Sequence, residues 1–172
     1  MVTPLADSQL FRSLLGCFAT GVTVATTLDT DGLAYGMTAS AVAAVSLEPP
    51  LLLICVDRDA KFHAAVGAGL GFALNVLASD QEHLSQIFAS SAADPFSKVE
   101  SHRASGGFPL LDGVVAHIIC AAWGSHEAGD HTVFFGTVIE GEMFDRPPLL
   151  HYRSQYTTIR PDGRTIVDPN FG

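Results

Sequence analysis

The hydrophobic positions of this chain first follow a helical spacing and then a strand spacing. Apolar residues within 8–18 recur at steps of one and three, which predicts an amphipathic helix with Asp7 or Ser8 as its N-cap. The alternating, β-branched run 21–28 predicts a strand. A DTDG turn follows it, and residues 33–42 are predicted to form the return strand of a hairpin.

The middle of the chain alternates between strand and helix patterns. After two prolines, the uninterrupted apolar run LLLICV (51–56) predicts a strand that is buried on both faces. Residues 57–68 begin with acidic residues and predict a short helix with an acidic cap. A strand is predicted over 71–77, and the SDQE sequence at 79–82 has the form of a capping box for a further helix.

The last part of the chain is dominated by strand patterns. A polar, glycine-rich stretch at 90–107 predicts a long loop, and three strands follow it at 114–123, 131–144 and 148–159. Regular alternation of strand and helix is missing, which argues against a doubly wound parallel sheet. The pattern favours a mainly β, antiparallel small barrel with peripheral helices.

The composition is that of a globular protein with a large core. We expect one domain over residues 1–172, with a core at about 8–156 and a peripheral hairpin or tail at 157–172. Hydrophobic residues make up 48% and charged residues 16%, and this apolar excess suggests further burial in an oligomer. The net charge of −9, without a basic cluster, argues against nucleic acid and anionic membranes as main partners.

The three cysteines lie far apart in apolar contexts and form no CxxC pair. Cys17, Cys55 and Cys120 are therefore predicted to be reduced, buried thiols of a cytosolic protein. The N-terminus has neither the charge pattern nor the apolar run of a signal peptide, and no apolar run approaches a membrane span. We therefore expect a cytoplasmic protein.

Several motif-like features do not carry the chemistry that they suggest at first sight. The glycines of GAGLG (67–71) lie between a helix and a strand, which is the reverse of the order in a dinucleotide-binding loop. The seven histidines form no HExxH motif, and His117, in an apolar strand, is interpreted as a core or lining residue. No GxSxG elbow is present. We therefore predict no metal site and no catalytic triad.

Seven strings in the same order give the chain a resemblance to a known family. They are FATGVTV (18–24), YGMTASAV (35–42), SLEPPLLLICVDR (46–58), FALNVLASDQ (72–81), IFAS (87–90), GDHTVFFGTV (129–138) and PPLLHYRSQY (147–156). Together they resemble the flavin reductase family, whose members have an FMN-binding split β-barrel with antiparallel, Greek-key strands. The likeness covers about residues 8–156.

The resemblance implies a homodimeric oxidoreductase that uses NADH or NADPH to reduce FMN, with FAD or riboflavin as possible acceptors. Its partner would be a flavin-dependent monooxygenase, supplied by diffusion of the reduced flavin. The alternative is a flavin-binding split-barrel module, such as a flavin store or redox sensor, without reductase turnover. A split-barrel oxidase or haem-handling relative is a third interpretation.

The resemblance also points to residues that would hold the flavin. These are Thr38, Ala39, Ser40, Ala41, Cys55, Val56, Asp57, Arg58, Lys61, Phe88 and Ala89. Small side chains at 38–41 let the backbone approach a flat ring, and a helix start with Arg58 or Lys61 favours a phosphate. By pattern alone, Phe88 is equally well explained as a core residue. The family often has hydroxyl residues near Ala60 and Phe62, and their absence here weakens the predicted hold on flavin.

On the nicotinamide side, the resemblance points to His131 and Tyr152. Hydride transfer needs no side-chain acid or base, so we assign no catalytic residue and only positioning roles. His131 would position the nicotinamide or its pyrophosphate, and Asp130 would orient the imidazole. Whether NADH or NADPH is used, the sequence leaves open.

Overall fold

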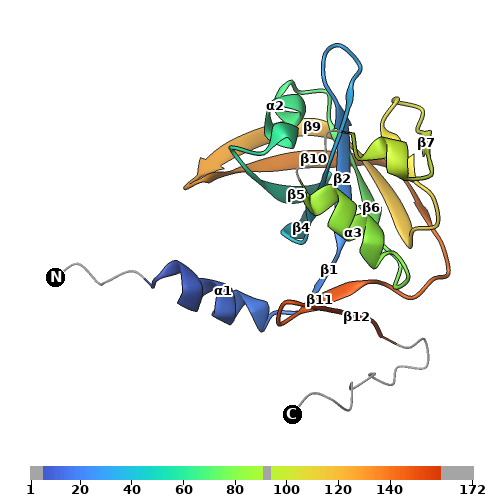
Figure 1. Cartoon of the computed structure of the whole chain (residues 1–172). Helices are drawn as coiled ribbons and strands as arrows, with labels where there is room; N and C mark the ends of the chain where they lie inside the picture. Colours follow the sequence, from blue (N-terminus) through green and yellow to red (C-terminus); the bar gives the residue numbers. More distant parts are fainter. Residues whose placement is uncertain (1–5, 91–93, 160–172) are drawn as a thin grey trace.

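The computed structural model describes residues 6–90 and 94–159, and its centre is a seven-stranded antiparallel sheet (Figure 1). The strands lie in the order β3-β2-β6-β9-β10-β5-β4. Their bounds are β2 Thr23–Leu28, β3 Ala34–Ala39, β4 Val42–Leu47, β5 Pro50–Asp57, β6 Phe72–Val76, β9 Ala116–Ala128 and β10 His131–Met143. The predicted mainly β, antiparallel fold is confirmed.

The two edge strands of this sheet, β3 and β4, are neighbours in sequence and are joined only by residues 40 and 41. Because a link of this length spans roughly 10 Å at most, the sheet curls until its two edges meet there. The carbonyl of Ala41 accepts a hydrogen bond from the Cys55 amide at 3.1 Å, which ties the link to β5. The sheet is thus a barrel that is split between β3 and β4. The prediction of one continuous strand at 33–42 was wrong, because the chain changes sheet edges within it.

Two short helices lie against this barrel (Figure 1). They are α2, Lys61–Gly67, and α3, Glu82–Ala89. The predicted acidic cap of α2 was wrong: Ala60 is the N-cap and makes no side-chain bond, while the Asp57 carboxylate accepts from the Asp59 amide. The capping box was wrong too. The α3 helix begins at Glu82, and the side-chain oxygen of Gln81 accepts from the Ala78 amide.

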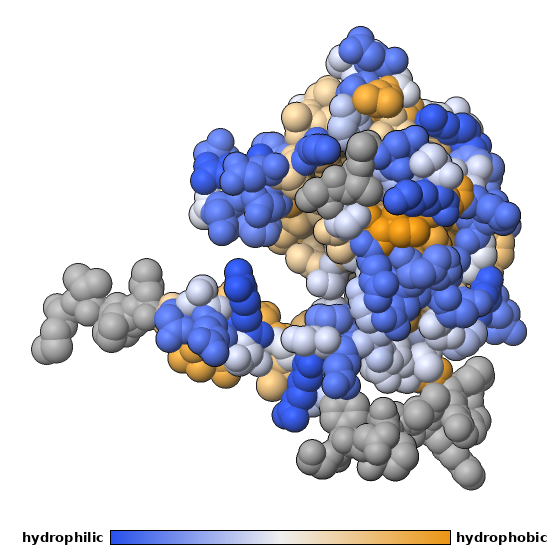
Figure 2. Space-filling model, in the orientation of Figure 1, coloured by the Kyte–Doolittle hydropathy of each residue, from blue (hydrophilic) through white to orange (hydrophobic). Residues whose placement is uncertain are grey.

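The first helix, α1 (Ser8–Gly16), has Asp7 as its N-cap, one of the two predicted caps. The Asp7 carboxylate accepts a hydrogen bond from the Leu10 amide at 2.8 Å. It projects away from the barrel, and none of its residues is buried (Figure 1). Figure 2 shows its apolar side chains on the surface. Cys17, just beyond the helix, is exposed and Cys55 is only half-buried, so the prediction of three buried thiols holds for Cys120 alone.

Two smaller sheets complete the described residues. One has the order β1-β11-β12, from Thr20–Gly21, Leu150–Tyr152 and Gln155–Thr157, and the other pairs β7 (Ser101–Arg103) with β8 (Pro109–Leu111). The predicted single strand at 148–159 is therefore a hairpin. The predicted loop at 90–107 contains β7 and a short 3₁₀ helix, η1 (Phe96–Lys98). Most of the predicted C-terminal tail, 160–172, lies outside the described residues.

The core lies between the sheet and the two packed helices, and within the described residues every buried side-chain nitrogen and oxygen has a hydrogen-bond partner. Asn75, fully buried in β6, donates to the Val24 carbonyl at 3.0 Å and accepts from the Leu111 amide at 2.8 Å. The buried imidazole Nε2 of His117 lies 2.9 Å from the Leu111 carbonyl oxygen. His117 thus has the core role that the sequence favoured, and Asn75 serves to join strands.

The β5 strand departs from its prediction in an informative way. Leu52, Ile54 and Val56 face the core, but Leu51, Leu53 and Cys55 are only half-buried. A continuous apolar run is typical of a strand with both faces covered. In a single chain, however, only the core face of β5 is covered. Within residues 6–90 and 94–159, no helix has the length and apolar character required to cross a membrane.

Candidate functional site

The predicted flavin residues at the end of β5 lie beside the start of β10. Asp57 pairs with His131 across the two strands. The Arg58 amide donates to the Asp130 carbonyl at 3.1 Å. Pairing with β10 therefore brings two groups together that are more than 70 residues apart in sequence, one predicted for flavin and one for the nicotinamide.

Residues 40 and 41, together with Ala39 at the end of β3, are called the 39–41 link, and they lie against the same end of the barrel. Ala41 is bonded through its carbonyl to Cys55, and the hydroxyl of Thr23 donates to the Ala39 carbonyl at 2.7 Å. Ser40 and Ala41 are exposed, and within the described residues their amide N–H groups donate no hydrogen bond. Free backbone donors beside small side chains fit the polar edge of a flat ring.

The α3 helix is held beside this link through β3. The Thr38 hydroxyl donates to the Ser85 carbonyl at 2.6 Å. Gly36 permits the close packing, because a Cβ there would lie 2.6 Å from the Phe88 ring. Phe88 is buried and packs against Phe96, whereas Ala89 at the helix end is exposed. Phe88 thus has a core role, and its contact with flavin stays a prediction.

Two exposed cations flank the turn from β5 into α2, namely Arg58 and Lys61. Positions 60 and 62, where the resemblance led us to look for hydroxyl side chains, have different roles in the structure. Ala60 is half-buried and begins the helix, whereas Phe62 is 2% exposed and belongs to the core. Position 62 thus serves packing, and an anion at this turn would depend on the two cations.

Asp130 and His131 form the polar pair that the sequence suggested. Nδ1 of His131 lies 2.7 Å from Oδ1 of Asp130. The pKa of the Asp130 carboxyl is lowered, chiefly by this hydrogen bond, then by its own backbone amide and by the charges of His131 and Arg58. A carboxylate on Nδ1 fixes the ring orientation and leaves Nε2 available to a ligand.

Tyr152, the second residue predicted for the nicotinamide, is not brought to this end of the barrel within one chain. It lies in the small β1-β11-β12 sheet, where the Arg153 guanidinium stands 5.4 Å from the centre of its ring. His131 and Tyr152 thus belong to different sheets.

One pair of side chains was missed by sequence reasoning. Nε2 of His63, on α2, lies 2.9 Å from the Thr132 hydroxyl on β10, and its ring meets Phe134 edge to face. This contact fixes the helix that carries Lys61 against the strand that begins at His131. No sequence motif predicts this contact, because His63 and Thr132 are 69 residues apart in sequence.

Two cavities in the described part of the chain lie elsewhere. One, of about 110 Å³, is lined by residues that include Gly69, Gly71 and Phe135. The other, of about 350 Å³, lies among Asp80, Glu100 and neighbouring residues, and neither contains a predicted flavin residue. The candidate site itself presents exposed residues, among them Ser40, Arg58 and Lys61. The described residues contain no cluster of metal-ligating side chains.

Comparisons with known proteins show the family of this chain. The profile of the flavin reductase like domain matches residues 15–160. The chain is 42% identical to the flavin-dependent monooxygenase reductase subunit HsaB of Rhodococcus jostii, over 95% of this chain and 83% of that protein. It is 41% identical to a flavin reductase (NADH) of Kitasatospora aureofaciens, over 95% and 88% of the two chains.

One solved structure matches nearly the whole length of this chain. The NADH:FAD oxidoreductase of Streptomyces globisporus, in complex with NAD and FAD fragments, superimposes with a TM-score of 0.86 at 37% identity, covering 94% of this chain and 100% of that one. The sequence profile, the relatives and the solved structure all indicate a flavin reductase. The chain therefore belongs to the flavin reductase-like family.

Proposed function

We propose that this protein is an NADH-dependent flavin reductase that supplies reduced flavin to a partner monooxygenase. The observation that carries the proposal is the meeting of the 39–41 link, the β5–α2 turn and the Asp130–His131 pair at one end of the barrel. Relatives named as reductase subunits of flavin-dependent monooxygenases, and as NADH-dependent flavin reductases, support it.

The flavin would lie across the 39–41 link. The free amide groups of Ser40 and Ala41 would bind its polar ring edge, and Arg58 and Lys61 its phosphate. When bound, flavin accepts a hydride from the nicotinamide, and the two cofactors carry this chemistry themselves. The protein residues bind and orient them, and no side chain acts as acid or base.

His131 would hold the nicotinamide side. Asp130 fixes the imidazole through Nδ1, so Nε2 can bond to the carboxamide or the pyrophosphate. The His63–Thr132 contact keeps β10 and α2 in register, so that the two halves of the site stay aligned. Replacement of His131 by Ala should raise the KM for NADH or lower turnover.

Flavin would be a passing substrate in this protein. The turn at Arg58 offers no hydroxyl at positions 60 and 62, and Phe62 is committed to the core. Within the described residues of this turn, Arg58 and Lys61 are the two cations left for the phosphate, and because both are exposed they favour exchange of flavin with solution. Release of reduced flavin to a monooxygenase requires such exchange. NADH is an intracellular cofactor, so the cytoplasm is the proposed compartment.

A homodimer would cover the open face of the barrel. Alternate residues of neighbouring strands share that face, which we call the outer face: Ala43, Leu51, Leu53, Cys55, Val133 and Phe135. They are apolar and at most half-buried within one chain. An apolar face shared by neighbouring strands is typical of an interface between subunits. His131 and Asp57 follow the outer face in the same register, which puts the candidate site at its rim.

Steady-state kinetics test this function. Purified protein with NADH and FMN should consume NADH well above a protein-free blank, with FAD, riboflavin and NADPH compared in parallel. Flavin binding without NADH consumption would favour the storage or sensor module instead. A haem absorption band in the purified protein would favour the third interpretation. A monomeric mass by light scattering would contradict the dimer.

A further inference from the structure

The α3 helix contacts β3, the strand that leads into the 39–41 link, at two matched points. The Thr38 hydroxyl donates to the Ser85 carbonyl at 2.6 Å, and a Cβ at Gly36 would lie 2.6 Å from the Phe88 ring. Residues three apart on a helix are separated by about 4.5 Å along its axis, and residues two apart on a strand by about 6.6 Å, so both pairs can meet side by side. The helix and the strand thus run antiparallel in one register.

The polar contact of this pair determines where along β3 the helix lies. Packing of Phe88 on Gly36 is non-directional, whereas a hydrogen bond weakens steeply when its distance and angle change. Ser85 is fully buried, and its side chain is held as well. Its hydroxyl lies 2.8 Å from the Tyr156 hydroxyl, and either group can donate. Ser85 is therefore fixed on both sides, by Thr38 at its carbonyl and by Tyr156 at its side chain.

Tyr156 has an anchor of its own in the small β1-β11-β12 sheet. It pairs with His151 across β11 and β12, and the two rings meet edge to face with their centres 5.6 Å apart. The Tyr156 side chain is half-buried and packs against the core cluster that contains Leu77 and Leu84. A chain of contacts thus runs from the small sheet through α3 to the end of β3.

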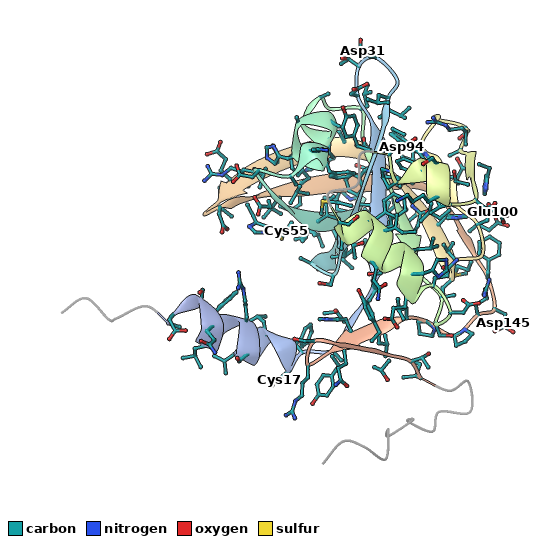
Figure 3. The ribbon with its side chains drawn as sticks, viewed as in Figure 1. Cys17, Asp31, Cys55, Asp94, Glu100 and Asp145 are labelled. Carbon is teal, nitrogen blue, oxygen red and sulfur yellow. The ribbon has the colours of Figure 1, made fainter. Side chains whose placement is uncertain are left out.

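Three hydrogen bonds hold the 39–41 link and the strand end before it. The Thr23 hydroxyl donates to the Ala39 carbonyl at 2.7 Å, and the amide of Cys55, labelled in Figure 3, donates to the Ala41 carbonyl at 3.1 Å. These two bonds come from strands of the barrel, and the third is the α3 contact. All three leave the amide N–H groups of Ser40 and Ala41, which donate no hydrogen bond within the described residues, available to a ligand.

We propose that Ser85 is a positioning residue for the flavin. Acting through Thr38, it holds the end of β3 so that the two free amides of the link keep the direction that the polar edge of the flavin ring requires. Tyr156 takes part by holding the Ser85 side chain. This inference rests on the proposed function and deepens it, because it names buried residues outside the site that decide how tightly the site binds the ring.

Equilibrium binding of oxidised flavin, followed by flavin fluorescence without NADH, tests this role apart from turnover. Ser85→Ala and Tyr156→Phe each remove one hydroxyl of the buried pair. Each should raise the Kd for FMN about three- to tenfold, which is the usual contribution of one hydrogen bond. The Kd for riboflavin should rise by the same factor, because the link binds the ring and not the phosphate. A rise confined to FMN, or an unchanged Kd in the folded variants, would overturn the proposal.

A double-mutant cycle shows whether the two hydroxyls act together. The double variant Ser85→Ala, Tyr156→Phe should bind flavin about as weakly as either single variant, because both substitutions remove the same bond. Losses that add would contradict the path from Tyr156 through Ser85. If Ser85→Ala does not fold, Tyr156→Phe and Thr38→Val carry the test, since they remove the partner on either side of Ser85. An unchanged Kd for FMN in both of these would end the proposal.

Two controls separate positioning from general stability. Gln86→Ala, which removes an exposed amide from the same helix, should leave the Kd for FMN unchanged. Asn75→Ala removes buried bonds elsewhere in the barrel, so it should lower the free energy of unfolding but not flavin affinity. In steady-state kinetics, Ser85→Ala should raise the KM for FMN and leave the KM for NADH at saturating flavin unchanged.

The same measurements keep this proposal distinct from the proposed function. An equal rise of both KM values in Ser85→Ala would indicate a general loss of structure and would contradict a positioning role. Wild-type protein that binds flavin without consuming NADH would refute the reductase function, while the binding data would still decide the role of Ser85.

Discussion

Replacement of Asn75 by Ala should destabilise the barrel without weakening flavin binding. The amide joins three strands, bonding the Val24 carbonyl, the Thr26 hydroxyl and the Leu111 amide. The residue is fully buried, so no water can replace these partners without rearrangement. Each buried polar group left without a partner costs about 1–3 kcal/mol, so the variant should lose ~2–5 kcal/mol of unfolding free energy. That is a large share of the ~5–15 kcal/mol typical of a domain.

Urea unfolding at one fixed protein concentration measures this loss. The matched control is Gln86→Ala on α3, whose exposed amide bonds only the Glu82 carboxylate, and it should change stability by about 0.5 kcal/mol or less. The KM for FMN of folded Asn75→Ala should equal that of wild type. A variant with full stability and a raised KM for FMN would refute the reasoning and make Asn75 a flavin contact.

Three further predictions concern thiols, a glycine and the outer face. Cys17, which is exposed, should react first with a thiol reagent; Cys55 should react more slowly, and saturating FMN should protect it further. Burial raises the pKa of the Cys120 thiol to about 12, so at pH 8 it should react only on unfolding, and early reaction would contradict its placement. Gly71→Ala should lower the melting temperature, since φ is +104° and a Cβ would lie 2.2 Å from the Cys120 carbonyl oxygen; an unchanged value would contradict this packing. Leu53→Arg should give a monomer by light scattering, and a dimer of unchanged mass would place the interface elsewhere.

Local patterns predicted most elements of this fold. The Asp7 cap and the period of 8–18 fixed α1, and the apolar run at 71–77 fixed β6, because these signals depend on neighbours along the chain. The link at 39–41 was missed for the opposite reason. Whether Val42 extends β3 or begins a strand at the far edge depends on pairing with Ile54, which lies beyond a turn.

In the candidate site, too, local patterns located single residues but did not show which residues come together. Strings along the chain located Arg58 and His131, but only the pairing of β5 with β10 shows that they meet. The His63–Thr132 contact had no sequence signal, since neither residue departs from its local pattern. The run LLLICV was predicted to be buried on both faces, and one chain buries only one of them. Apolar patterning records burial but not whether the neighbour belongs to the same chain.

Anaerobic reduction of FMN by NADH tests the central claim most directly. With the purified protein, the absorbance of oxidised flavin should bleach as one NADH is consumed per flavin, far faster than in a protein-free mixture. His131→Ala should slow this bleaching, and admission of oxygen should restore the oxidised spectrum. Flavin that binds the protein but stays oxidised in the presence of NADH would contradict the account.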